Sequence, residues 1–139
     1  MLYLTAILLL EVDGCKKYKV LSEADRAQGN TEWPYNRHDD GMVTGWYRFL
    51  GAAGDHMPDK CVLGHSCGII YPGWLNGEHP TVAEGVVTRQ VCFYSGINCC
   101  TWSRYIEVKN CTSYYVYKLE STNGWYFRYC GNAGAGKLH

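Results

Sequence analysis

The feature that most constrains this chain is its set of eight cysteines. They stand at Cys15, Cys61, Cys67, Cys92, Cys99, Cys100, Cys111 and Cys130. An even number of cysteines in a short chain with a candidate export segment predicts a disulfide framework, here of four bridges. Cys99 and Cys100 are adjacent, so we expect them to bridge to two different segments and to hold both at one point. The spacing leaves the pairing itself open.

A zinc site is the competing interpretation of these cysteines, because thiolates also bind Zn²⁺. Structural zinc sites usually contain closely spaced pairs such as Cys-x-x-Cys, and the chain has none. We therefore expect no metal and no cofactor.

The 16 glycines and 12 tyrosines indicate many turns and many amphipathic side chains. Together these observations predict a small, disulfide-rich, β-dominated domain with short antiparallel strands and hairpins, long loops and at most one or two short helices.

Length and charge exclude several functional classes. The 139 residues suffice for one domain but not for two ordinary cores. Thirteen Lys and Arg balance thirteen Asp and Glu, so no overall positive field favours nucleic acid as a partner. Thiol catalysis would need an unbridged cysteine, which an even set of eight does not leave. We therefore expect no catalytic residues and no enzymatic activity.

The two ends of the chain differ from its middle. Residues 2–10 are apolar except for Thr5, a run too short for the roughly 20 residues of a membrane-spanning helix. They fit a signal peptide at residues 1–14, which predicts secretion and no membrane span. The disulfide-stapled domain would occupy residues 15–130. Residues 131–137 have the glycine and lysine spacing of a phosphate-binding loop, but Leu138 replaces the required hydroxyl, so we expect residues 131–139 to form a flexible tail.

Several segments have the composition of strands. Residues 17–21, 46–50, 85–94, 105–111 and 113–119 are rich in β-branched and aromatic side chains. In one of them Ile106 and Val108 alternate with Glu107 and Lys109, which predicts a strand buried on one face. Residues 22–28 favour a short helical turn capped by Ser22. Residues 29–44 contain proline, glycine and asparagine and predict a loop.

A hairpin is predicted near the end of the chain. Asn123-Gly124 separates residues 114–122 from residues 125–130, and this dipeptide favours a two-residue type I′ turn with positive φ at both positions. The register of that hairpin would place Tyr115, Tyr117, Leu119, Tyr126 and Cys130 on one face, which we expect to be the core. Lys118 would lie opposite Tyr129 on the other face.

A long series of residues resembles a known family. The series comprises Gly45-Trp46-Tyr47-Arg48-Phe49, Gly51, Gly54, Met57-Pro58, Trp74-Leu75-Asn76-Gly77, His79-Pro80, Glu84-Gly85-Val86-Val87, Arg89, Trp102, Val108-Lys109 and Tyr114-Tyr115-Val116-Tyr117, with the cysteines between them. It resembles the uromodulin-type eight-cysteine domain, which occurs in uromodulin, the pancreatic secretory granule membrane glycoprotein and the liver zona-pellucida-domain protein. The resemblance covers residues 15–130.

The resemblance implies a non-catalytic, extracellular module beside EGF-like or zona pellucida domains. It also implies four disulfides, which join Cys15 to Cys111, Cys61 to Cys99, Cys67 to Cys130 and Cys92 to Cys100. Two further cysteines of the uromodulin pattern are both absent here, where residues 38–40 and 125–128 stand instead. Their joint absence fits their being partners of each other, because loss of one alone would leave a free thiol.

The family presents an N-glycan that pathogen adhesins bind, on a Trp-Leu-Asn-Gly-Thr segment. The matching segment here ends in Glu78 instead of threonine, which removes the acceptor sequence at Asn76. The chain's N-glycosylation sequence is Asn110-Cys111-Thr112. Asn110 is therefore the candidate glycosylation site, and the glycan-decoy role does not carry over through Asn76.

The candidate partner surface is the segment around the family's glycan position. It comprises Trp74, Leu75, Asn76, Glu78 and His79. Pro72, Gly73, Gly77 and Pro80 predict a loop here, although Trp74 packed over disulfides is an open alternative. The preferred function is an interaction module of a secreted glycoprotein of the matrix, mucus or host-defence type, whose partners are extracellular proteins or glycans.

A carbohydrate-binding module is the alternative function. In it, exposed Tyr and Trp side chains would stack on sugar rings, while Asn76, Glu78 or Asp59 would accept hydrogen bonds from hydroxyls. Arg48 lies between aromatic residues and is expected to pair with a nearby carboxylate. The histidines His56, His65 and His79 show no ligand spacing, and we expect them to be structural or solvated.

Overall fold

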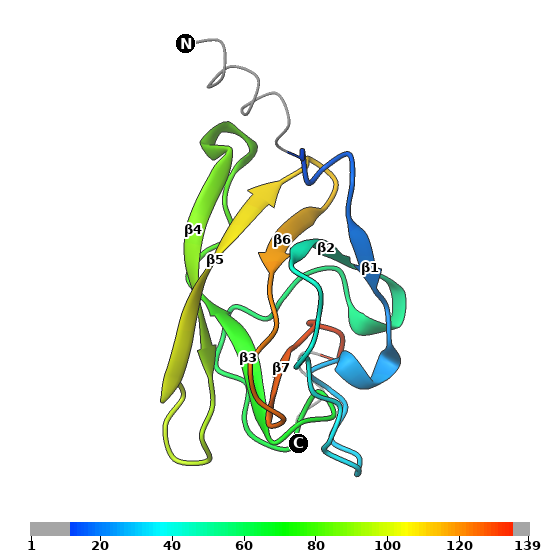
Figure 1. The fold of residues 1–139 in the computed structure, drawn as a ribbon, viewed down its shortest axis with the longest axis vertical. Helices are drawn as coiled ribbons and strands as arrows, with labels where there is room; N and C mark the ends of the chain where they lie inside the picture. The colour runs from blue at the N-terminus through cyan, green and yellow to red at the C-terminus, as the bar shows by residue number, and fades with distance from the viewer. Residues whose placement is uncertain (1–11, 135–139) are drawn as a thin grey trace.

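The computed structural model describes residues 12–134 and consists of one curled, seven-stranded sheet (Figure 1). The strands are β1 (Lys19–Leu21), β2 (Gly45–Phe49), β3 (Tyr71–Asn76), β4 (Val86–Phe93), β5 (Trp102–Asn110), β6 (Tyr115–Leu119) and β7 (Phe127–Tyr129). Three short 3₁₀ helices, η1 (Ala24–Arg26), η2 (Gly51–Ala53) and η3 (Val82–Glu84), are the helical elements of the described range. The predicted β-dominated class with long loops and little helix is confirmed.

The strand order across the sheet is β1-β2-β6-β5-β4-β3-β7. The five inner strands pair antiparallel, and the long β4–β5 hairpin runs along one side of the molecule (Figure 1). Both edge strands pair in parallel, β1 with β2 and β7 with β3. All five segments predicted as strands from composition contain one, and residues 29–44 form the predicted loop. The helical turn also exists, but η1 begins after Glu23, so Ser22 is not its cap.

The main core lies on the concave face of the curled sheet. The alternation along β5 places Ile106 and Val108 in it, while Glu107 points outward, as predicted. Tyr117 and Leu119 of β6 are fully buried in the same core, with Phe49 of β2 packed edge-on against Tyr117. Burial of such side chains, at roughly 25 cal/mol per Å² of apolar surface, is the main driving force for folding.

A second core cluster surrounds the disulfides. The four bridges are Cys15–Cys111, Cys61–Cys99, Cys67–Cys130 and Cys92–Cys100, the same pairs that the family resemblance implies. Adjacent Cys99 and Cys100 thus bridge to two different segments. Trp74 is buried among these cysteines and donates its indole N–H to the carbonyl of Cys99, at 2.9 Å. The alternative in which Trp74 packs over disulfides is therefore correct.

The predicted Asn123-Gly124 hairpin is wrong. β6 pairs with β2 and β5, whereas β7 pairs with β3, so the two segments are not partners. Lys118 consequently lies beside Trp46 and Glu107 rather than opposite Tyr129, and Tyr126 is exposed. Asn123 has φ 53°, but Gly124 does not have a positive φ. The turn is held instead by the 39–41 loop: Asp39 O accepts from Thr122 N, and Ser121 Oγ accepts from Gly41 N.

The loop predicted at residues 72–80 is wrong for residues 72–76, because β3 is an interior strand there. Gly73 permits it: a Cβ at this position would lie 2.7 Å from the Phe93 ring and 3.0 Å from the carbonyl of Arg128. Pro72 lacks an N–H, but its carbonyl accepts a bond from Tyr94 N at 3.2 Å. A small residue and a proline thus mark a close approach of neighbouring strands here, rather than a break in pairing.

A buried ion pair connects η1 to the long loop that follows it. Arg26 and Asp39 form a two-pronged contact, with distances of 2.7 Å and 2.9 Å, and both side chains are buried. Arg26 also donates to the carbonyl of Tyr129 at 2.9 Å, and Asp39 accepts from the amide of Tyr129 at 2.8 Å. The pair therefore joins η1 and the loop after it to β7, which is far from both in sequence.

The ends of the described range bear on the predicted domain boundaries. Residues 131–134, predicted to begin the flexible tail, are packed: Gly131 pairs with Ala27, and Ala133 O accepts from Gly29 N. Most of the candidate signal peptide and residues 135–139 lie outside the described residues.

Within residues 12–134, no helix is long and apolar enough to cross a membrane. In the same range, no three His, Cys, Asp or Glu side chains are grouped so that they could hold a metal ion.

Candidate functional site

The candidate site is the end of β3 and the loop that leads to β4, residues 76–85. Asn76 and Glu78 are exposed and His79 is half-buried, so these three residues of the predicted surface are brought together at the protein surface. Trp74 and Leu75 do not belong to it, because both are buried inside the sheet. The predicted partner surface is thus wrong for these two residues. We call the remaining exposed stretch, Asn76 to His79, the loop surface.

Hydrogen bonds hold the loop surface in one conformation. Arg89 of β4 donates its Nε–H to the carbonyl of Glu78, at 2.9 Å. Asn76 donates its amide to Gln90 Oε1, also at 2.9 Å, and so lies flat along the neighbouring strand. Gly77 adopts φ 144°, a conformation that side chains rarely tolerate. The loop is therefore a fixed platform with polar groups facing water.

The loop ends in a capped 3₁₀ helix. Glu84 Oε1 accepts from both the backbone N–H and the hydroxyl of Thr81, at 2.9 Å and 3.2 Å, which completes a capping box at η3. These hydrogen bonds, that from the Thr81 backbone above all, hold the pKa of Glu84 below its usual value. The cap fixes the point at which the chain turns back into β4.

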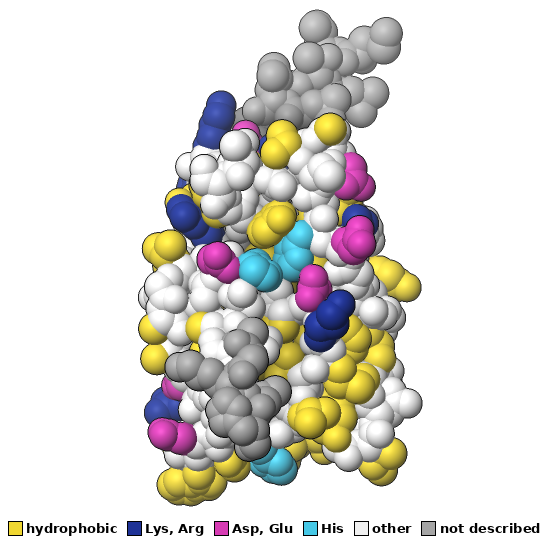
Figure 2. Space-filling model, turned by 180° about the vertical axis from the view of Figure 1, so that it is seen from behind, with side chains coloured by type: hydrophobic (Ala, Val, Ile, Leu, Met, Phe, Trp, Pro, Cys, Tyr) yellow, Lys and Arg dark blue, Asp and Glu magenta, His cyan; other side chains and the backbone are white. Residues whose placement is uncertain are grey.

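A pair of histidines stands beside the loop surface. The ring centroids of His56 and His79 are 5.1 Å apart, and the ring centroid of Tyr115 lies 4.4 Å from that of His79. Figure 2 shows two adjacent histidine side chains on the rear face, with acidic side chains close to them. His56 contacts Asp55 at 2.6 Å and Asn132 at 3.2 Å. The expectation of structural histidines fits this packing.

The hydrogen bonds of His79 fit its neutral form. The hydroxyl of Tyr117 accepts from the amide of Met57 at 2.9 Å and lies 2.8 Å from His79 Nε2, to which it can donate its proton when the ring is neutral. Burial of the ring, with the nearby charge of His56, lowers the pKa of His79 from 6.5 to about 4. Burial likewise raises the pKa of Tyr117. His79 is thus committed to the structure and is not available as a base in the neutral range.

This arrangement predicts a loss of stability in mild acid. The folded pKa of His79 lies below the unfolded value of 6.5, so the unfolded state binds the proton first. Its contribution is present in full above pH 6.5 and is lost as the pH falls from 6.5 toward 4. We expect a loss of about 2 kcal/mol, allowing for partial exposure of the ring. Urea unfolding at about pH 7 and about pH 4.5 measures it.

The matched control for this acid effect is His79→Gln, which cannot titrate. Glutamine can still accept the hydrogen bond from Tyr117. We expect the variant to be less stable than the parent at neutral pH but to lose less stability on acidification. Identical pH slopes for the two proteins would show that His79 does not cause the acid sensitivity.

The candidate glycosylation site lies next to the same loop. Asn110, the last residue of β5, donates its side-chain amide to the carbonyl of Pro80 at 3.0 Å. Its side-chain oxygen accepts from the amide of Thr112 at 2.8 Å, and Cys111 between them is bridged to Cys15. Asn110 is half-buried, so its nitrogen is less accessible than that of Asn76.

Two other interpretations from the sequence can be compared with the structure. The predicted pairing of Arg48 with a carboxylate is not found within residues 12–134: its guanidinium stacks 4.0 Å from the ring centroid of Tyr114 and donates to the hydroxyl of Tyr18. The sequence does not predict that His56 meets His79, because the two stand in different loops and no periodic pattern connects them. Within residues 12–134, every cysteine is in a disulfide.

Comparison with known proteins gives GP2 and uromodulin among the relatives of this chain. Pancreatic secretory granule membrane major glycoprotein GP2 of Canis lupus familiaris is 43% identical over 122 residues, which cover 87% of this chain and 24% of that protein. GP2 of Homo sapiens is 38% identical over 119 residues, covering 85% and 22%. Uromodulin of Mus musculus is 38% identical over 119 residues, covering 85% and 18%. The chain thus spans about a quarter or less of these relatives.

A family model matches the part of the chain that holds the loop surface. The match runs over residues 47–131, more than half of the chain, and corresponds to the uromodulin-like eight-cysteine domain. It includes seven of the eight cysteines. The chain therefore belongs to the family of uromodulin-like eight-cysteine domains.

Proposed function

We propose that this chain is a non-catalytic interaction module of a secreted or surface glycoprotein, and that the loop surface is its contact site. The observation that carries the proposal is the fixed, exposed stretch Asn76 to His79, anchored by Arg89 and by the buried strand before it. A rigid loop loses little conformational freedom on binding, which favours recognition. The relatives named above are glycoproteins, and four disulfides suit an oxidising, extracellular location.

The chemistry of the site supports binding rather than catalysis. No thiol is free among the described residues, and His79 Nε2 is hydrogen-bonded to the hydroxyl of the buried Tyr117. The exposed groups of the loop surface are an amide, a carboxylate and backbone. Such groups recognise a partner through hydrogen bonds but do not form an activated nucleophile. Extracellular proteins or glycans are the partners that we propose, with EGF-like or zona pellucida domains beside the module in a longer chain.

A glycan restored at the loop surface tests this proposal. Glu78→Thr creates an Asn-Gly-Thr acceptor sequence at Asn76, whose side chain is exposed. We expect expression in a host that adds oligomannose glycans to attach one additional glycan, visible by mass spectrometry. The variant should then bind a mannose-specific bacterial adhesin domain, whereas the unaltered chain should not bind it through Asn76. Because Glu78 is exposed, Glu78→Thr should leave the backbone of the loop unchanged.

Two controls decide the result. The double variant Asn76→Gln/Glu78→Thr keeps the threonine but removes the acceptor nitrogen, so it should gain neither glycan nor adhesin binding. Asn110→Gln should leave the gain intact. If Glu78→Thr accepts no glycan, the loop surface is not accessible as proposed. If the chain that keeps Glu78 shows strong, mannose-inhibited binding after Asn110→Gln, the proposal that the loop surface lacks its glycan is wrong.

A further inference from the structure

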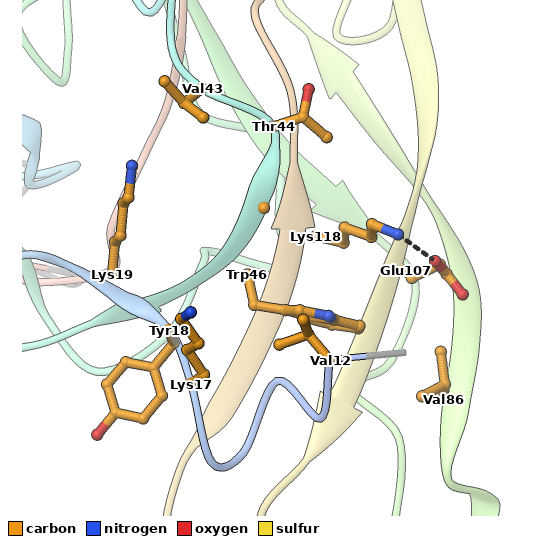
Figure 3. Close-up of a pocket in the computed structure, with 11 residues that line it drawn as sticks. Val12, Lys17, Tyr18, Lys19, Val43, Thr44, Trp46, Val86, Glu107 and Lys118 are labelled. Atoms are coloured by element: carbon orange, nitrogen blue, oxygen red, sulfur yellow. Dashed lines mark ion pairs between the residues drawn. The ribbon is translucent and has the colours of Figure 1, made fainter. Parts of the chain in front are cut away.

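We propose that a groove on the outer, convex face of the sheet binds an acidic oligosaccharide. The groove lies over β1, β2, β6 and the edge of the β4–β5 hairpin, and its volume is about 620 Å³ (Figure 3). We call it the Trp46 groove. Its lining comprises Val12, Lys17, Tyr18, Lys19, Val43, Thr44, Gly45, Trp46, Val86, Glu107 and Lys118. None of these residues belongs to the loop surface, so the proposal does not depend on that site.

Trp46 provides an aromatic wall that is held in place. The backbone of Gly14 packs flat against the indole, so closely that a Cβ at Gly14 would overlap the ring. Figure 3 shows the indole extended across the groove, between Val12 and the Lys118–Glu107 pair. The exposed part of an indole carries negative charge density on its face, which attracts the C–H groups of a sugar ring. A fixed aromatic surface of this kind makes sugar stacking favourable.

The charges around the groove favour a negatively charged ligand. Lys118 and Glu107 pair across neighbouring strands, at 3.8 Å, and so neutralise each other. Lys17 and Lys19 are exposed and form no ion pair with any residue in the 12–134 range. Among residues 12–134, the groove therefore carries two positive charges without an ion-pair partner, close to an aromatic wall. Carboxylate or sulfate groups on a sugar would interact with both ammonium groups.

The groove continues into a second hollow, which makes room for a chain of sugars. This hollow has a volume of about 270 Å³ and shares Thr44, Glu107 and Lys118 with the groove. It adds the hydroxyl of Thr88, the exposed ring of Tyr105 and the carboxylate of Glu120, which pairs with Arg104 at 3.4 Å. Hydroxyls, two carboxylates that each pair with a basic side chain, and a second aromatic ring beyond Trp46 suit hydrogen bonds and stacking along successive sugar rings.

A saccharide fits this surface better than a peptide does. The backbones of β2, β6, β5 and β4 are already paired with one another beneath the groove, so a bound peptide could add a strand only at the outer edge of β1, a strand of three residues. Recognition must come from side chains alone: an indole, ammonium groups and hydroxyls. Sugars offer the matching groups on every ring, whereas an acidic peptide would use only the lysines.

Binding measurements on the purified chain test the proposal. The probes are a heparin-derived hexasaccharide, a chondroitin sulfate hexasaccharide, neutral maltohexaose and hexaglutamate, each titrated calorimetrically at low salt. We expect at least one acidic saccharide to bind more tightly than both maltohexaose and hexaglutamate. Trp46→Ala should weaken that binding roughly tenfold or more. Lys17→Gln/Lys19→Gln should weaken it about tenfold and reduce its salt dependence.

Controls separate the groove from general charge and from misfolding. Arg37→Gln/Lys60→Gln removes the same charge from exposed positions that line neither the groove nor the second hollow, and it should leave affinity within about twofold. Val43→Glu introduces a negative charge on an exposed groove residue without touching the core, and it should abolish binding even if Trp46→Ala does not fold. Equal affinity for hexaglutamate, equal effects of the two charge-removing double variants, or no binding of either acidic saccharide would overturn the proposal.

Discussion

Replacing both Cys67 and Cys130 by alanine is expected to leave the chain largely unfolded at about 37 °C. Their bridge closes a loop with a sequence separation of 63, and both cysteines are fully buried in the second core cluster. Loop-closure entropy alone gives such a bridge about 4 kcal/mol. Deleting two buried sulfur atoms adds a cavity beside Trp74 and Ile69. A small domain has only about 5 to 15 kcal/mol in total, so little stability would remain.

The matched control is the double alanine variant of Cys92 and Cys100. Their bridge has a sequence separation of 8, for which the same entropy argument gives about 2 to 3 kcal/mol. We therefore expect this variant to fold, with a clearly smaller loss in thermal denaturation followed by circular dichroism. Equal melting temperatures for the two double variants would show that loop length does not govern the contribution of these bridges.

The second large effect is expected at the buried ion pair. Asp39→Ala removes the buried, two-pronged carboxylate partner of Arg26 and leaves only the more exposed Glu23, at 3.3 Å from Nε; it also removes the acceptor for the amide of Tyr129. Breaking one partner of a buried pair typically costs about 3 to 5 kcal/mol. We expect the midpoint of urea unfolding to fall accordingly. Glu120→Ala is a suitable comparison, because its pair with Arg104 lies at the surface and should contribute less than about 1 kcal/mol.

A double-mutant cycle separates the interaction energy between Arg26 and Asp39 from the cost of burying one charge without its partner. Arg26→Met/Asp39→Ala removes both charges, so no uncompensated ion stays in the interior. We expect the double variant to be more stable than Asp39→Ala alone. Additive losses for the two single substitutions would indicate that Arg26 and Asp39 act independently, contrary to their two-pronged contact.

The features of the fold that can be predicted from the sequence are those set by local chemistry. Alternation along residues 106–109 determines which face of β5 is buried, and β-branched and aromatic composition locates five of the strands. The failures occur where a distant partner decides the outcome. Asn123-Gly124 has ideal local chemistry for a hairpin, yet β7 pairs with β3, and Trp125 instead donates its indole N–H to Asp40.

The candidate site is predictable only in part for the same reason. Asn76 and Glu78 are at the surface because β3 ends at Asn76. The sequence pattern wrongly predicts that Trp74 and Leu75 are exposed. Their neighbours Pro72 and Gly73 are typical of a loop, but in this fold Pro72 and Gly73 allow neighbouring strands to approach closely. The Trp46 groove cannot be predicted at all: it combines the N-terminal segment with several strands, and only the register of Trp46, Lys118 and Glu107 brings its charges together.

The crossing of the disulfides also determines how this module behaves under mechanical tension. When residues 15 and 130 are pulled apart, the Cys15–Cys111 bridge carries the force directly past the strands between them. Two routes of similar length then connect this bridge to residue 130: residues 111–130 themselves, and residues 99–111 with residues 61–67, joined by the Cys61–Cys99 and Cys67–Cys130 bridges. The span can therefore reach at most about 65 Å, against about 390 Å for an unbridged chain. Strands β1 to β4 and the loop surface lie on neither route, so a pull on the two ends reaches them only through their contacts with β5, β6 and β7.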